Sequence, residues 1–113
     1  MERRFPTYQA FWPHYVSEHR NKLNRNLHFL GTSLVLLLVL MAAINANAWL
    51  LLGLPFAGYG FAWAGHYFVE KNRPLTFEYP LWSLIADFQM FAFMCLGRMD
   101  REVKRMGVLK LDA

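Results

Sequence analysis

The feature that most limits the possible folds is a segment from Asn26 to Val69 that contains no Asp, Glu, Lys or Arg. It is more than twice as long as the about 20 apolar residues that one membrane-spanning helix needs. A helix in a water-soluble core keeps a polar face, which this segment lacks over most of its length. We therefore predict an all-α integral membrane protein that forms a single domain over residues 1–113.

Turn and interface residues divide the apolar sequence into helices. Asn45 and Asn47 flank one alanine and predict a tight turn. This turn leaves one span over Leu27–Asn45 and a second over Trp49–Glu70. A further apolar segment, Leu81–Gly97, is barely long enough to cross a bilayer. The expected fold is a polytopic helical bundle with two full spans, a short third apolar helix and an amphipathic aromatic helix at the N-terminus.

Aromatic side chains recur at spacings of three and four between Phe5 and Tyr15, which places them on one side of a helix. Pro13 removes a backbone donor and disfavours helical geometry at the residue before it, so the expected helix is kinked. Tryptophan and tyrosine are typical of the membrane–water interface. We predict that this amphipathic helix lies on the membrane surface.

Basic residues gather at Arg3–Arg25, Lys71–Arg73 and Arg98–Lys110, and the net charge is +4. Because these clusters flank apolar segments, membrane lipids are the expected partner and nucleic acid is not. The positive-inside rule predicts that both termini are cytoplasmic. Three full spans would place the C-terminal arm outside. Either Leu81–Gly97 dips into the membrane and returns, or it lies along the interface, or the aromatic N-terminal segment is itself inserted.

Three of the four histidines fall near predicted cytoplasmic helix ends. His19 and His28 are nine residues apart, about two and a half turns, so one straight helix would point them to opposite faces. Asparagines between them allow the backbone to break, with a new helix starting near Asn24 or Asn26. Antiparallel packing then brings His28 to the depth of His66. Three imidazoles at one place suit a divalent metal such as iron or zinc.

Two acidic residues lie near these histidines in the predicted topology. Glu70 is one turn beyond His66 and could complete the metal's ligand shell or orient a ligand through a hydrogen bond. Asp87 lies inside an apolar segment, where an acidic residue is functional by default. It could instead pair with Arg73 or cap a re-entrant turn. His14, among aromatic residues, is expected to be an interfacial residue.

The pattern of histidines is also compatible with three roles other than an enzymatic metal site. The first is a non-catalytic membrane scaffold or assembly protein in which the histidines are structural. The second, a metal or proton carrier, would need polar residues through the bilayer centre, where Ser33–Ala43 offers almost none. The third is a bis-histidine haem protein.

Two segments, Tyr15–Thr32 and Gly65–Met90, resemble the small membrane proteins related to the yeast 2-hydroxy fatty acid dioxygenase, a family formerly classed as a domain of unknown function. The motifs are EH, NRxLHFxGT and GHxxxEKNRPxTFxYPLWSLxxDF, and the resemblance extends from about Tyr8 to Met99. It implies a non-haem Fe(II) enzyme that uses O2 as co-substrate to shorten a 2-hydroxy fatty acid by one carbon, an alpha-oxidation step. It also implies the endoplasmic reticulum or a bacterial inner membrane.

The resemblance places the family's histidines on His19, His28 and His66, which are the implied iron ligands. Glu70, Asn72, Pro74 and Asp87 match further motif positions, and Glu70 and Asp87 are the remaining candidates for catalysis. A 2-hydroxy acid could chelate the iron through its carboxylate and hydroxyl oxygens, with its tail between the apolar helices.

Candidate contacts to partners complete the expectations. Arg20, Arg25 or Arg73 is expected to hold the substrate carboxylate, because a guanidinium suits bidentate contact. Gly58 and Ala62 form a small-residue surface that suits a helix partner. That partner is either internal or a second copy of the chain, so a homodimer is possible.

Overall fold

The computed structural model describes residues 5–112, with side chains up to Gly107, and this range is helical without a strand. The predicted all-α fold class is therefore confirmed. Arg3 and Lys110, the ends of two predicted basic clusters, lie outside the described side chains. The main helices are α1 (Tyr8–Ser17), α2 (Lys22–Ile44), α3 (Phe61–Ala64), α4 (Pro80–Cys95) and α5 (Met99–Asp112).

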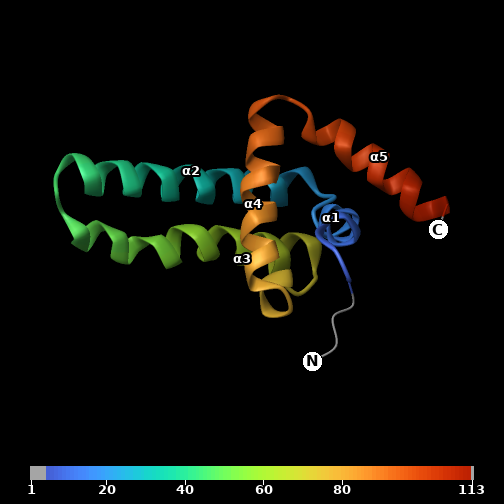
Figure 1. Ribbon diagram of the computed structural model, residues 1–113, viewed down its shortest axis with the longest axis horizontal. Coiled ribbons are helices and arrows are strands. Elements are labelled where there is room, and N and C mark those ends of the chain that lie inside the picture. Colours follow the sequence, from blue (N-terminus) through green and yellow to red (C-terminus); the bar gives the residue numbers. More distant parts are fainter. Residues whose placement is uncertain (1–4, 113) are drawn as a thin grey trace.

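The two long apolar helices form an antiparallel hairpin (Figure 1). One is α2, and the other is Ala48–Glu70, which contains α3 and is called here the second hairpin helix. Both are long and apolar enough to cross a membrane, with mean hydropathies of 2.4 and 1.2. The predicted tight turn joins them, and the Asn47 side chain accepts a hydrogen bond from the Trp49 N–H. Two candidate spans are confirmed, although α2 begins before the predicted Leu27.

The second hairpin helix is irregular along its length. It begins as a 3-10 helix (Ala48–Gly53), widens into a π-helical segment (Phe56–Gly60), and ends in another (Gly65–Glu70). Pro55 lacks an N–H and stands where the winding changes. Single π-helical turns are frequent at functional sites, because they rotate side chains away from their ordinary helical positions.

The predicted backbone break between the first two helices is present, but earlier than expected. Helix α1 ends at Ser17, and the Asn21 side chain caps α2 by accepting a hydrogen bond of 2.9 Å from the Leu23 N–H. The new helix therefore begins at Lys22 and not near Asn24 or Asn26. His19 lies in the short connection between the helices.

The aromatic face of α1 packs inside the protein. This helix runs through Pro13 and lies against α4 and α5, where its apolar side chains form a core. Its buried members are Phe11, Trp12, Tyr15, Val16, Leu75, Tyr79, Ala86, Met90, Met99 and Met106. The observed helix α1 thus differs in one respect from the expected surface helix. Its aromatic side chains contact protein, because α4 and α5 supply an apolar surface that the spacing within α1 does not reveal.

Helix α4 crosses the open end of the hairpin and does not run alongside it (Figure 1). The chain leaves this helix at Gly97, whose left-handed φ of 69° allows the Arg98 N–H to reach the Phe93 carbonyl at 2.8 Å. It then turns by 118° into α5. Two helices qualify as spans, or three if this bent pair is one. The placement of Leu81–Gly97 relative to the membrane and the side on which the termini lie stay predictions.

Candidate metal centre

Three histidines from three separate elements converge at the open end of the hairpin. His19 comes from the α1–α2 connection, His28 from the second turn of α2, and His66 from the final π-helical segment. All three are buried. Their ring centroids are 4.5 to 4.9 Å apart, and the rings are close to perpendicular. One ligand nitrogen from each ring lies within 4.8 Å of the others, so among residues 5–112 they form a group that could hold a metal.

Backbone carbonyls fix the orientation of two of the rings. His19 Nδ1 lies 2.6 Å from the Tyr15 carbonyl oxygen, and His28 Nδ1 lies 3.0 Å from the Asn24 carbonyl oxygen. A carbonyl oxygen only accepts, so both Nδ1 atoms carry a hydrogen and donate it. Each Nε2 is then left with a lone pair directed away from its carbonyl, as in metal-binding histidines.

A side chain fixes the third ring. His66 Nδ1 lies 2.6 Å from the Asn72 Oδ1 atom. Asn72 in turn donates from Nδ2 to the Glu18 carbonyl oxygen at 3.2 Å and to the Glu18 carboxylate. These two acceptors set the orientation of the amide, so its oxygen faces the imidazole and His66 donates from Nδ1. All three rings therefore have Nε2 left for a ligand bond.

The contact between His19 and His28 favours a cation at this place. Their two Nε2 atoms are 3.2 Å apart, and with both Nδ1 hydrogens committed to carbonyls two lone pairs face each other. A proton or a metal ion between them removes this repulsion. Burial, together with the neighbouring His28 and His66, lowers the pKa of His19 well below its usual value, so a proton is disfavoured. Imidazole nitrogens suit zinc, copper, iron and nickel.

A small cavity of about 10 Å³ adjoins the histidines. That volume is just enough for one water-sized ligand, so the space is far too small for a haem. Its other walls include Tyr59, Trp63, Ser83 and Asp87. Three histidines leave further coordination positions open, as catalytic metal sites require.

Asp87 stands at the edge of this cavity and is held by Tyr15. The Tyr15 hydroxyl donates to the Asp87 carboxylate, and its ring stacks on His19 at a centroid distance of 4.0 Å. Burial first, and then the nearby carboxylate, raise the pKa of Tyr15 well above its usual value, so this hydroxyl stays a donor. The suggested pairing of Asp87 with Arg73 is not formed, because the Arg73 guanidinium lies 4.8 Å above the Phe77 ring.

Glu70 lies outside the group of histidine nitrogens. Its Oε1 accepts from the Asn21 N–H at 2.5 Å and from Asn24 Nδ2 at 3.4 Å. Both donors belong to the start of α2, and the Asn24 carbonyl holds His28. Of the two roles considered for Glu70, the structure favours positioning through a neighbouring residue over direct ligation.

The arginines that were candidates for substrate binding have different surroundings. Arg25 is buried and donates to the carbonyl oxygens of His19 and Arg20, at 2.8 and 2.6 Å, and to Asp100 at 2.7 Å. It therefore fixes the loop that carries His19. Arg20 and Arg73 are exposed, and their contact with a substrate stays a prediction. His14 pairs with Glu18 at 3.2 Å.

Sequence reasoning missed the residues that orient the rings. Tyr15 and Asn24 each precede a histidine by four positions, the spacing at which a helical carbonyl reaches a ring on the next turn. This spacing was available in the sequence. Asn72 matches a position of the motif EKNRP, but its role was not predictable, because its contact with Glu18 joins segments 54 residues apart.

Of three comparisons with known proteins, one found a match. A family model described as 2-hydroxy-palmitic acid dioxygenase Mpo1-like matches residues 5–99, a range that contains all three histidines and Asp87. No curated protein and no solved structure was found to match the chain.

Proposed function

The chain belongs to the 2-hydroxy-palmitic acid dioxygenase Mpo1-like family, and from that premise we propose that it is a membrane-bound non-haem Fe(II) dioxygenase that shortens 2-hydroxy fatty acids by one carbon. The observation that carries the proposal is the group of three buried histidines, each with Nδ1 committed and Nε2 left to bind. Two helices apolar enough to cross a membrane fit a lipid substrate.

His19, His28 and His66 are the proposed iron ligands. Tyr15, Asn24 and Asn72 accept hydrogen bonds from their Nδ1 atoms and keep Nε2 unprotonated. Bound Fe(II) would supply the redox chemistry that activates O2, a role that Zn²⁺ cannot fill. These hydrogen bonds orient all three rings without a metal, so the protein itself would set the donor geometry.

Asp87 is the proposed acceptor for the substrate's 2-hydroxyl group. Its carboxylate borders the cavity beside the histidines, and Tyr15 holds it there. Removing the hydroxyl proton would make the hydroxyl-bearing carbon easier to oxidise. A fatty acid without the 2-hydroxyl would keep only the Tyr15 contact at this carboxylate and lose the hydrogen bond from the substrate, so the site would favour a 2-hydroxy acid.

The overall reaction balances without a further reductant. The bond between C1 and C2 of the acid breaks, C1 leaves as CO2, and C2 becomes the carboxyl carbon of the shortened acid. The electrons released by these two carbons reduce one O2 molecule. One of its oxygen atoms enters the new carboxyl group and the other is released as water.

The competing interpretation, a scaffold with structural histidines, accounts for the burial of the rings. It leaves the 3.2 Å contact between two unprotonated nitrogens unexplained. A structural trio would be expected to use these nitrogens in hydrogen bonds, since buried polar atoms are normally satisfied.

Oxygen consumption tests the proposed reaction. Protein purified in mild detergent without oxygen and loaded with Fe(II) is expected to consume O2 when 2-hydroxypalmitate is added. It should release pentadecanoate and CO2 in equal amounts, with carboxyl-labelled substrate giving labelled CO2. Palmitate, which lacks the hydroxyl, is the matched control and should support little uptake. Iron-loaded protein that consumes no O2 with any 2-hydroxy fatty acid would contradict the proposal.

A further inference from the structure

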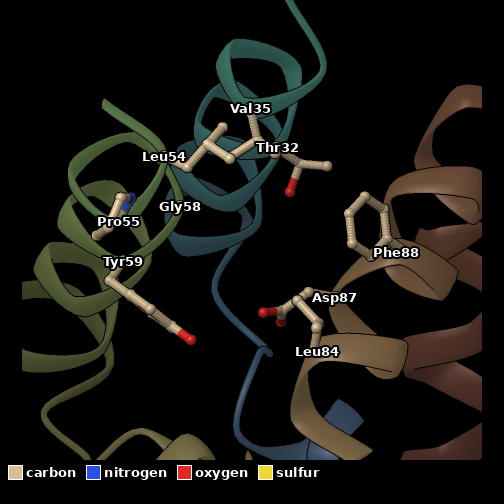
Figure 2. A pocket seen from close by; sticks show the side chains of 9 residues that line it. All are labelled: Thr32, Val35, Leu54, Pro55, Gly58, Tyr59, Leu84, Asp87 and Phe88. Carbon is tan, nitrogen blue, oxygen red and sulfur yellow. The ribbon is translucent and has the colours of Figure 1, made fainter. Parts of the chain in front are cut away.

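An apolar groove of about 270 Å³ lies between α2, the second hairpin helix and α4 (Figure 2). It is somewhat smaller than the about 300–1,000 Å³ typical of pockets that enclose a whole small ligand. Most of its walls are hydrocarbon. The lining residues are Thr32, Val35, Leu54, Pro55, Gly58, Tyr59, Leu84, Asp87 and Phe88.

One end of the groove meets the histidine cavity. Tyr59 and Asp87 line both spaces. Figure 2 shows their oxygen atoms directed into the groove from opposite helices at this end, while Val35 and Leu54 lie toward the other. The groove thus has a polar end beside the histidines and an apolar end along the hairpin. An amphipathic ligand with one polar end matches this arrangement.

Two buried polar atoms in residues that line the histidine cavity have no hydrogen-bond partner among the described residues. They are Ser83 Oγ and Trp63 Nε1. Ser83 is almost fully buried, so its hydroxyl has lost contact with bulk water without gaining an internal partner. Such atoms call for a bound water or ligand. Both are donors, and a carboxylate or hydroxyl oxygen would satisfy them.

We propose that the groove binds the alkyl tail of the substrate acid, with the polar end of the acid directed between Tyr59 and Asp87 toward the histidines and within reach of Trp63 and Ser83. This inference rests on the proposed function and names the tail subsite of that reaction. The occupant is one acyl chain, because the polar end leads to the proposed reaction centre and the rest is apolar. The remainder of a long tail extends along the hairpin into lipid.

Gly58 makes room for this tail. A Cβ atom added at Gly58 would contact only Val35 Cγ2, at 3.4 Å, an ordinary distance, so a larger side chain would extend into the groove. Gly60 is two residues further on in the same π-helical segment, and a Cβ atom there meets nothing within 4 Å. Leucine at Gly60 is therefore the matched control for leucine at Gly58. Gly58, expected to receive a helix, lies against Val35 of α2 and also borders the groove.

Chain-length preference tests the groove through turnover. The ratio of kcat/KM for 2-hydroxypalmitate to that for 2-hydroxybutanoate, whose tail is too short to fill the groove, is expected to fall by about tenfold or more in Gly58→Leu, since a filled groove rejects the longer tail. Gly60→Leu should keep the wild-type ratio. A ratio unchanged in Gly58→Leu, or lowered equally in both variants, would overturn the assignment.

Photolabelling tests the groove without turnover. The probe is a 2-hydroxy fatty acid with a diazirine in mid-tail, added to the detergent-purified protein. Labelling should be saturable, competed by 2-hydroxypalmitate, located on peptides with Leu54 or Leu84, and lost in Gly58→Leu but not in Gly60→Leu. Unsaturable labelling, or labelling indifferent to Gly58→Leu, would overturn the groove. Labelling of the groove without O2 uptake would remove the proposed function and keep the groove. Turnover together with labelling that Gly58→Leu does not change would keep the proposed function and remove the groove.

Discussion

His28→Ala is expected to remove bound iron and turnover together. His28 supplies one of three converging nitrogens, and two imidazoles in a site built for three leave the ion poorly held. Loss of a residue that merely orients a ligand commonly costs about 10–100-fold in metal affinity or activity. Loss of a ligand should therefore cost at least about a hundredfold. Iron content and O2 uptake, measured on the same preparation, check this result.

His14→Ala is the matched control, because it removes an imidazole that lies outside the group and is linked to it only indirectly, through Glu18 and Asn72. It should keep iron and most activity. Helical content and thermal unfolding in detergent show whether each variant is folded, and His28→Gln, which keeps a polar side chain, provides a second test if the alanine variant unfolds. Full iron content in folded His28→Ala would remove His28 from the proposed ligands.

Gly65→Ala is expected to disrupt the fold and the metal centre at once. A Cβ atom at Gly65 would lie 1.9 Å from Asn24 Oδ1 and 3.3 Å from the Asn24 Cα, so the buried Asn24 side chain must shift and its backbone must give way slightly. The Asn24 carbonyl holds His28, and Gly65 immediately precedes His66. Overpacking of this kind costs about 1–3 kcal/mol of stability, and displaced rings should lower iron affinity by about tenfold or more.

Gly60→Ala serves as the control for that change. Its backbone φ of −57° suits alanine, and its surroundings are open. This variant should be as stable as the wild type or slightly more so, since alanine reduces the freedom of the unfolded chain. Thermal unfolding midpoints and Fe(II) titrations compare the two variants. Equal midpoints and equal iron affinities would mean that the close approach at Gly65 has no structural consequence.

Much of the fold follows from local patterns. The charge-free segment and the Asn45–Asn47 turn predict the hairpin, and the asparagines after His19 predict the break before α2. The packing of α1 against α4 and α5 was not predictable in the same way. An aromatic face on a helix is compatible with lipid or with protein, and only the three-dimensional arrangement decides which one it contacts. The left-handed residue Gly97 explains the bend after α4 but not where α5 packs.

The candidate site, like the fold, has a part that the sequence predicts and a part that it does not. His19, His28 and His66 are identifiable because helix ends at one depth bring them together, and the structure places them in one group. The partner of Asp87 proved to be Tyr15 and not Arg73, and Arg25 is committed to carbonyls and Asp100. These contacts depend on which side chains face one another across separate helices, and spacing along the chain does not specify that.

Metal content tests the central claim most directly. Elemental mass spectrometry would be applied to wild-type protein purified without oxygen or chelator, before and after Fe(II) is added and excess removed. We expect about one iron per chain after Fe(II) addition, and loss of that iron in the variant with His19, His28 and His66 all replaced by alanine. Wild-type protein that retains no iron after Fe(II) addition, or a triple variant that retains as much iron as the wild type, would contradict the account.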